Sequence, residues 1–446
     1  MIRIFVVIGL FFFTGLFGGE YNPTTLVIPP FQHTFGYNKV TLSALKMVVG
    51  NTIKFNNPQG IAAVKLKALD DKSTSEDDDE LTVFAVNSGA NEIFYNKGFK
   101  GAATFGGFGS GEGQFWQPMG ICANPDGDVW VADKRNDRIV KLFCDGMNLK
   151  FVRNVGEYGL FNGEFDGPTD VAMDPKGKVY VTDTGNDRIQ VFSPDGNFLY
   201  AFSGTNDFRL HSPTAIDVIG KNDRWSFWGK PFIVVVDDNR TRLTQFSMKG
   251  KPLATQSTYG LQLDGAQFGY VAIDYYSNIY VTDEANSQID MFDRELKFVT
   301  TFGREGTDKA EFYHPRGIAI WKKYGQVFIL EESDAQYYWM GVDAYIKGVF
   351  PAIFTAERPG ATISLFITQP AHITVNIYSK DTGKLVRTLI PKYKRDVGEE
   401  NIVWDGLDSY GKLVSPGKYE IKIILTPTYS SEGNFSKEIT CYAERQ

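Results

Sequence analysis

The sequence predicts an all-β protein in which a six-bladed β-propeller is followed by a smaller β-sandwich. A phrase with alternating apolar residues, then Asp, Asn and Arg-Ile at fixed distances, returns six times along the chain, in three clear copies and three worn ones. Its centres are Asn87, Asp133, Asp183, Asp237, Asp283 and Glu331. They lie between 46 and 54 residues apart. A period of that size, built from short alternating strands, is typical of a β-propeller.

The composition fits two turn-rich β domains and argues against some partners. The chain has 446 residues, including 45 glycines, and 43% of its residues are apolar. Its formal net charge of −7 argues against a nucleic-acid partner, which would need a basic face. Cys122, Cys144 and Cys441 are too few and odd in number for a disulfide scaffold. We interpret them as buried apolar residues.

The first residues have the pattern of an export signal. Arg3 supplies a positive start, Ile4–Phe13 is an almost unbroken apolar run, and small residues follow. The run is short for a membrane span, and no later segment is long and apolar enough to be one. We expect a signal peptide over residues 1–19 and an exported protein in the periplasm, at the cell surface or outside the cell. An uncleaved anchor or a buried first strand are the alternatives.

Residues 165–202 show how one repeat forms a four-stranded blade. The turns at 174–177, 183–187 and 193–196 are rich in Asp, Asn, Gly and Pro. Alternating apolar residues between them predict strands at 171–173, 179–181, 189–192 and 198–202. We expect Asp183 to accept amides of its own turn and Arg188 to brace a blade. A residue needed in every blade holds the blade together rather than contacting a ligand.

These residues carry a family resemblance. The patterns Phe-x-x-Pro-x-Gly-Ile, Asp-Gly-x-Val-x-Val-Ala-Asp and Asn-x-Arg-Ile resemble the NHL repeat over roughly residues 55–340. The resemblance implies a six-bladed propeller, which we place at residues 20–349. The sixth blade has no convincing fourth strand after residue 340, where 345–349 is a weak candidate. We therefore expect a strand at about 39–48 to close blade six and the ring.

The rest of the chain predicts a linker at 350–358 and a sandwich at 359–446. Strands are expected at 363–367, 372–377, 385–389, 400–404 and 419–425. The run that contains Thr382-Gly383, Trp404-Asp405-Gly406 and Pro416-Gly417 resembles the immunoglobulin-like module of the flagellar hook-capping protein. That module recurs in exported bacterial proteins. The resemblance implies a spacer or docking module, with Trp404 in its core.

Some enzymes that have a ring of this kind hold a metal ion at the channel. The chain resembles in fold a zinc-dependent amidating lyase, whose family places a His after the repeat Pro in alternate blades. The matching positions here are Gln59, Met119, Thr169, Thr214, Gly269 and Arg316, so that zinc site is not carried over. His33, His211 and His314 could form a different set of zinc ligands, but their spacing in the sequence does not follow the repeat. Lactonase-like propellers hold Ca²⁺ with channel carboxylates, but here such positions offer little beyond Asp170. We expect no cofactor, with Zn²⁺ or Ca²⁺ as the alternative.

Binding is expected at the mouth of the channel, where propellers hold ligands. Positions that differ between equivalent blades are where a particular function is encoded. The candidate lip residues are Gln59, Met119, Thr169, Asp170, His211, Thr214, His314 and Arg316. Ordinary channel lining is the alternative.

The opposite face gathers aromatic residues in the loops of blades four to six. They are Trp225, Phe227, Trp228, Tyr275, Tyr276, Trp321 and Tyr324. Exposed aromatic clusters mark contact surfaces, so we expect the sandwich or a partner to dock there. The favoured function is non-enzymatic recognition or scaffolding of a protein, peptide or glycan. The alternative is a metal-assisted lyase or hydrolase at the channel mouth.

Overall fold

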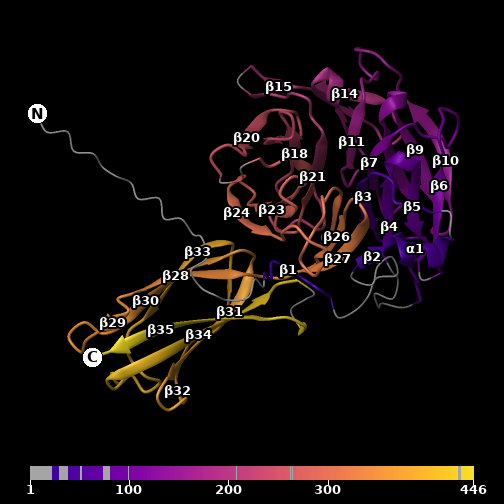
Figure 1. Ribbon diagram of the computed structural model, residues 1–446. Coiled ribbons are helices and arrows are strands. Elements are labelled where there is room, and N and C mark those ends of the chain that lie inside the picture. The colour runs from indigo at the N-terminus through magenta and orange to yellow at the C-terminus, as the bar shows by residue number, and fades with distance from the viewer. Residues whose placement is uncertain are drawn as a thin grey trace, which may run out of the picture.

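The computed structural model shows a propeller joined to an elongated sandwich (Figure 1). It describes residues 23–29, 39–50, 53–73, 81–98, 100–206, 208–261, 263, 265–429 and 433–446. The expected signal peptide (1–19) and His33 lie outside the described residues. No helix within the described ranges is long and apolar enough to cross a membrane.

Five blades are antiparallel sheets of four consecutive strands. Blade one contains β3 (Pro58–Val64), β4 (Thr82–Asn87), β5 (Glu92–Asn96) and β6 (Ala102–Gly106). Blade two contains β7 (Pro118–Ala123), β8 (Asp128–Asp133), β9 (Arg138–Cys144) and β10 (Leu149–Val155). Blade three contains β11 (Pro168–Met173), β12 (Val179–Asp183), β13 (Arg188–Phe192) and β14 (Phe198–Phe202).

Blades four and five follow the same plan. Blade four contains β17 (Ala215–Ile219), β18 (Phe232–Asp237), β19 (Arg242–Phe246) and β20 (Pro252–Ser257). Blade five contains β21 (Phe268–Ile273), β22 (Ile279–Asp283), β23 (Gln288–Phe292) and β24 (Phe298–Phe302). A small hairpin, β15 (Gly204–Thr205) and β16 (Phe208–Arg209), precedes blade four. Short 3-10 turns cover Ser88–Ala90, Lys134–Asn136 and Thr184–Asn186.

The propeller core lies between neighbouring blades. Trp130 and Ile139 of blade two pack with Phe165, Val171 and Val179 of blade three in one buried cluster. Each blade therefore buries the apolar face of its neighbour, which the alternation of its strands predicts. The first strand of each blade lines the channel, and β25 of blade six contacts β3 of blade one, so the ring is closed.

Blade six is completed by the N-terminal segment. Its own strands are β25 (Ile318–Trp321), β26 (Gln326–Leu330) and β27 (Asp334–Met340). Two short N-terminal strands, β1 (Leu26–Val27) and β2 (Lys39–Thr41), both pair antiparallel with β27.

The strand expected at 39–48 needs correction, because Leu42–Val49 form helix α1. The Thr41 side chain caps this helix by accepting a hydrogen bond from the Ala44 amide (3.3 Å). Leu45 is buried, while Met47 and Val48 on other sides of the helix are exposed. A helix that buries one side against the propeller accounts for this pattern, because consecutive residues of a helix point in different directions around its axis.

The sandwich has two sheets around one core. The first contains β28 (Ala344–Phe350), β30 (Ala361–Ile367) and β33 (Gly398–Trp404). The second contains β29 (Ile353–Phe354), β35 (Lys437–Arg445), β34 (Gly417–Pro427), β31 (Ala371–Ser379) and β32 (Leu385–Arg395). Trp404 is fully buried in the core, and its indole N–H donates to the carbonyl of Leu407 (3.0 Å).

The expected domain boundary also needs correction. The propeller was predicted to end at residue 349 and a linker to cover 350–358, but strands β28 and β29 of this region pair with β30 and β35 of the sandwich. The predicted linker contains the short strand β29, so it belongs to the sandwich. The last propeller strand ends at Met340 and the first sandwich strand begins at Ala344. The connection therefore leaves little free chain between the domains.

Candidate functional site

A cavity of about 330 Å³ opens at the mouth of the channel, on the face where the inner strands begin (the mouth face). Five predicted lip residues line it: Gln59, Met119, Thr169, Thr214 and Arg316. Lining residues that were not predicted as site residues include Asn57, Lys134, Arg240, Tyr270 and Glu284. The mouth is therefore more highly charged than the predicted lip.

A repeated irregularity places the lip side chains. In blades one, two and three the register shifts right after the first Pro of the inner strand, at Pro58, Pro118 and Pro168. Such bulges bend a strand and redirect the next side chain. The residue after each Pro, namely Gln59, Met119 or Thr169, lines the cavity.

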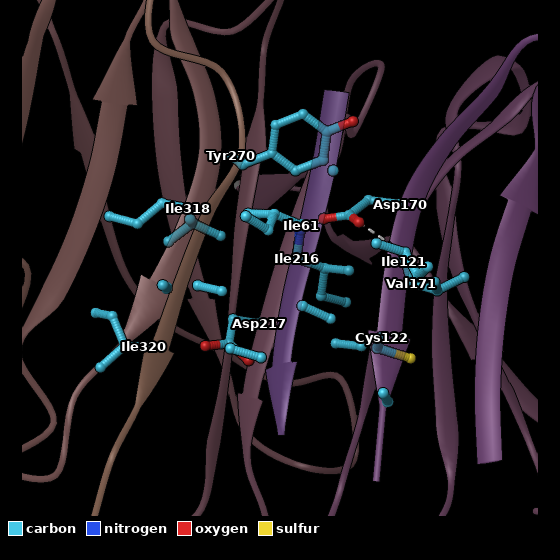
Figure 2. Close-up of a pocket in the computed structure, with 18 of the residues that line it drawn as sticks. Ile61, Ile121, Cys122, Asp170, Val171, Ile216, Asp217, Tyr270, Ile318 and Ile320 are labelled. Carbon is cyan, nitrogen blue, oxygen red and sulfur yellow. Dashed lines mark hydrogen bonds between the residues drawn. The ribbon is translucent and has the colours of Figure 1, made fainter. Parts of the chain in front are cut away.

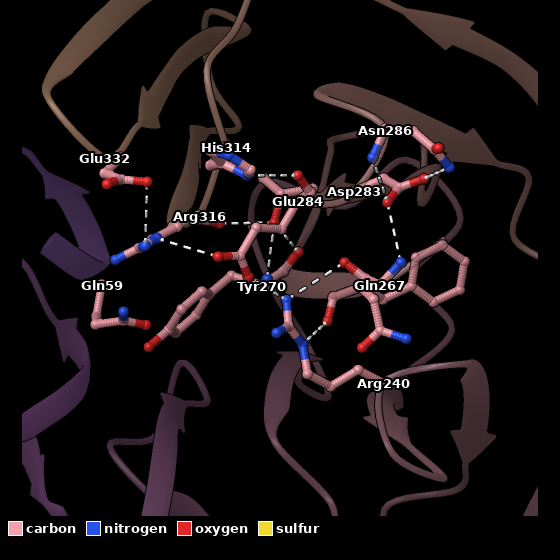
Figure 3. Close-up of polar contacts among 12 residues, drawn as sticks. Gln59, Arg240, Gln267, Tyr270, Asp283, Glu284, Asn286, His314, Arg316 and Glu332 are labelled. Atoms are coloured by element: carbon pink, nitrogen blue, oxygen red, sulfur yellow. Dashed lines mark hydrogen bonds and ion pairs between the residues drawn. The ribbon is translucent and has the colours of Figure 1, made fainter. Parts of the chain in front are cut away.

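Two arginines and two glutamates form one ion network on one side of the mouth (Figure 3). Arg240 Nη2 lies 2.6 Å from Glu284 Oε2, and Arg316 Nε lies 3.4 Å from Glu284 Oε1. Arg316 also donates to Asn57 Oδ1 of blade one, across the closure of the ring. Glu332 lies 3.7 Å from Arg316 Nη2 and is more exposed. Glu284 is thus shared between two arginines.

Lys134 brings a third cation to the mouth from blade two. It directly follows Asp133, the last residue of β8, and its side chain lines the cavity. Its ammonium group has no hydrogen-bond or ion-pair partner among the described residues. Burial, and then the nearby Arg135, lower the pKa of Lys134. The ammonium group is therefore partly removed from water, and no described acceptor replaces the lost hydration.

The two predicted histidines do not line the cavity. His211 is exposed, and its backbone carbonyl accepts from the Asp238 amide (2.7 Å). His314 lies behind the ion network, with Nδ1 3.1 Å from the Glu284 carbonyl oxygen. Among the described residues, no group of three or more His, Cys, Asp or Glu is placed to hold a metal ion.

Asp170 lies below the lip, in the channel interior (Figure 2). Its carboxylate accepts from the amides of Val171 and, in blade four, Ile216 (both 2.9 Å). Asp217 joins blades four and five in the same way through the Ile273 amide (2.8 Å). Burial raises the pKa of Asp170 well above its ordinary value, despite these hydrogen bonds. Asp170 thus links neighbouring inner strands.

Two neighbouring loops of the mouth face expose large apolar side chains. These apolar loops are residues 107–117, between β6 and β7, and residues 156–167, between β10 and β11. Their exposed apolar residues are Phe108, Trp116, Tyr158, Leu160 and Phe161. The turn between the loops contacts both, because Asn136 donates to the Gly109 carbonyl (2.9 Å) and Asp137 accepts from the Gly167 amide (2.8 Å).

The repeated Asp–Arg pair holds these loops. Arg188 Nε lies 2.7 Å from Asp183 Oδ2, and its other nitrogens donate to the carbonyls of Leu160, Phe161 and Glu164 (2.8–3.0 Å). In blade two, Arg138 pairs with Asp133 and donates to carbonyls of residues 110 and 114 in the same manner. In these two blades the Asp–Arg pair of the repeated phrase therefore holds the loop that precedes the inner strand of the same blade. We call this pair the Asp–Arg clamp.

Comparison with known families agrees with this geometry. Residues 115–142 and 165–192 match the family model of the NHL repeat. The propeller carries NHL repeats. Residues 354–427 match the FlgD Ig-like domain, so the resemblance stated for the sandwich is confirmed as well. No curated protein matches the chain.

Solved structures similar to the chain contain propellers. A streptogramin B lyase is 17% identical, with 67% of this chain and 96% of that chain covered and a TM-score of 0.44. PorZ, a surface component of the type-IX secretion system of Porphyromonas gingivalis, is 14% identical (90% and 53% covered, TM-score 0.45), so the chain spans about half of its length. A gluconolactonase from Xanthomonas campestris is 10% identical (71% and 98%, TM-score 0.44).

The opposite face of the NHL propeller contacts the sandwich. Tyr276 Oη lies 2.5 Å from Thr428 Oγ1, and its ring meets Tyr429 edge-on at 5.4 Å. Lys394 from β32 lies over the rings of Phe227 (4.4 Å) and Tyr276 (4.9 Å). These contacts place the sandwich against blades four and five.

The other predicted aromatic residues of that face have partners within the propeller. Arg294 covers the Trp228 ring (3.9 Å), and Lys323 lies near both Trp225 (5.7 Å) and Tyr324 (4.4 Å). Tyr275 packs against Phe227 and Tyr276. Trp321 is partly buried against the cores formed by blades one, two and six.

One sequence signal would have found Lys134 and Glu284. Both directly follow the central Asp of the repeated phrase. The six residues at this position are Ser88, Lys134, Thr184, Asp238, Glu284 and Glu332. They differ from blade to blade as the lip residues do, and the same reasoning about unequal positions applies to them.

Proposed function

We propose that this is an exported, non-enzymatic binding protein that docks a polypeptide partner on the apolar loops of its mouth face. The observation that carries the proposal is the exposure of large apolar side chains on clamped loops. Phe161 is 78% exposed and Leu160 is 73% exposed, although Arg188 fixes the backbone of both residues. Exposed apolar patches of this kind mark interaction sites.

The energetics favour a docking role for these side chains. Burying one exposed Leu or Phe in an interface contributes roughly 1.5–3 kcal/mol. Because Arg188 already holds the loop, little additional backbone order has to be imposed on binding. The contact surface is therefore organised before the partner arrives.

The charge of the loops indicates the kind of polypeptide. Glu112 and Glu157 are exposed within the two apolar loops, and Glu157 directly precedes the exposed Tyr158. Electrostatic complementarity favours a partner that carries basic residues next to apolar ones. The signal-like pattern of residues 1–19 supports an encounter outside the cytoplasm.

A peptide-display selection against the immobilised full chain tests the proposal. We expect enrichment of peptides with apolar and basic residues. Their affinity should fall at least about tenfold for the double variant Leu160→Ser/Phe161→Ser. The matched control Leu199→Ser/Leu253→Ser changes two half-exposed residues on outer strands and should retain binding. Equal binding to both variants, or binding of oligosaccharides alone on a glycan array, would overturn the proposal.

A further inference from the structure

The geometry points to a second recognition element: we propose that the cavity at the channel mouth binds a carboxylate group. That this carboxylate belongs to the docked polypeptide rests on the proposed function, whereas the anion site itself does not. The cavity borders the apolar loops, because Lys134 precedes Arg135, whose Nε donates to Gln117 of the first loop (2.8 Å). A chain that covers the loops can therefore extend a carboxylate into the mouth.

The first argument is the charge of the lining. Lys134, Arg240 and Arg316 line the cavity together with a single carboxylate, Glu284. Glu284 is already committed, since one oxygen faces Arg240 at 2.6 Å and the other faces Arg316 at 3.4 Å. The lining therefore keeps a positive excess, and a low-dielectric concave wall concentrates its field on a bound anion.

The second argument is that donors remain available. The Lys134 ammonium has no partner among the described residues, and its pKa is lowered by burial. Arg316 Nη1 is occupied by Asn57 and by the Pro58 carbonyl, whereas Nη2 has, within the described part of the chain, only Glu332 as an ion-pair partner, at 3.7 Å. That separation is longer than a hydrogen bond. A carboxylate between Lys134 and Arg316 would supply acceptors for both cations.

The third argument is the shape of the cavity. Its volume of about 330 Å³ suits a chain end or one acidic side chain. Tyr270 borders both this cavity and the interior cavity of about 160 Å³ below it. Burial raises the pKa of Tyr270 well above its ordinary value, so the hydroxyl stays neutral and does not repel an anion. Gln59 and Asn57 offer neutral polar contacts at the rim.

The test uses defined small probes with the full chain. Isothermal titration at low ionic strength compares N-acetyl-Ala-Ala with a free C-terminal carboxylate with the same dipeptide as an amide. We expect the acid to bind at least about tenfold more tightly, and the difference to shrink as salt is added. Lys134→Met should abolish the preference and Lys134→Arg should retain it. Lys176→Met, in an exposed turn on the opposite face, is the control.

Several outcomes would overturn the inference. Equal binding of acid and amide would do so, as would an unchanged preference in Lys134→Met. Inorganic phosphate that binds as tightly as the acid would show a general anion site instead of a carboxylate site. The variant Leu160→Ser/Phe161→Ser leaves the cavity lining intact. Acid binding that persists when the peptide selection fails would therefore contradict the proposed function and leave the carboxylate site standing.

Discussion

The side-chain amide of Gln369 in the sandwich donates a hydrogen bond to the buried carboxylate of Asp274 in the propeller (3.4 Å from Nε2 to Oδ2). Asn278 completes this contact, because its amide donates to Asp274 (3.0 Å) and to Gln369 Oε1 (3.2 Å). The two domains therefore meet through a buried polar cluster next to the aromatic contacts of Tyr276. Buried polar contacts fix one relative orientation, since unpaired groups are costly.

Asp274 gives the protein a pH-dependent stability. Burial raises its pKa to about 6, from an ordinary value of 3.8. Because the folded pKa lies above the unfolded one, this contribution is fully present below about pH 4 and is lost as the pH rises through 6. Asp274→Asn should therefore raise the free energy of unfolding at pH 8 by about 1–3 kcal/mol, with no gain at pH 4. Denaturant titrations at both pH values check this, with the exposed Asp195→Asn as control.

Removal of the Gln369 side chain should loosen the domain contact. Gln369→Ala removes the hydrogen bonds that Asp274 and Asn278 make to that side chain of the sandwich, at a cost of about 1–3 kcal/mol, while the bond between Asp274 and Asn278 remains. We expect a larger radius of gyration by small-angle scattering and faster proteolysis between Met340 and Ala344. An unchanged scattering profile and cleavage rate would show that the aromatic contacts alone hold the sandwich. Asn376→Ala provides the comparison, because Asn376 lies in β31 and its side chain contacts Thr388 within the sandwich.

The Asp–Arg clamp should be important for stability as well as for loop shape. Arg188→Ala leaves the fully buried Asp183 without its cation and frees three carbonyls of the second apolar loop. Removing one partner of a buried ion pair costs about 3–5 kcal/mol. Thermal unfolding measures the loss. Arg153→Ala removes an exposed arginine with one backbone contact and should change little; a similar loss in both variants would contradict the clamp.

Deletion of the N-terminal strands should open the ring. A chain that begins at residue 51 lacks β1, β2 and α1, and with them the buried Leu26, Val40 and Leu45. Each buried side chain contributes roughly 1.5–3 kcal/mol, so the loss is about 5 kcal/mol or more. The free edge of β27 should also promote aggregation. A chain that begins at residue 23 is the control, and equal melting temperatures for the two chains would refute closure by this segment.

The sequence predicted those parts of the structure that repeat. The period located the residue after each inner-strand Pro, so Gln59 and Arg316 were correctly placed at the lip. Lys134 and Glu284 were not predicted as site residues. Each directly follows the structural Asp of the repeated phrase, and the variation between blades at that following position was not considered. Helix α1 was missed because the apolar run at 39–48 is short, and a run of that length fits a strand as well as a helix. The contact of Gln369 with Asp274 depends on how two domains meet, and no periodicity in the chain encodes that.

The pairing of Leu26 with Met340 constrains the order in which the protein can fold during synthesis. The first strands to be synthesised find their partner only after nearly the whole propeller has followed them. Blades one to five can form from neighbouring segments, but the ring stays open until β27 is made, and the sandwich arrives later still. Closure of the ring therefore depends on a contact between two ends of the propeller that are more than 300 residues apart, and it cannot precede the synthesis of β27.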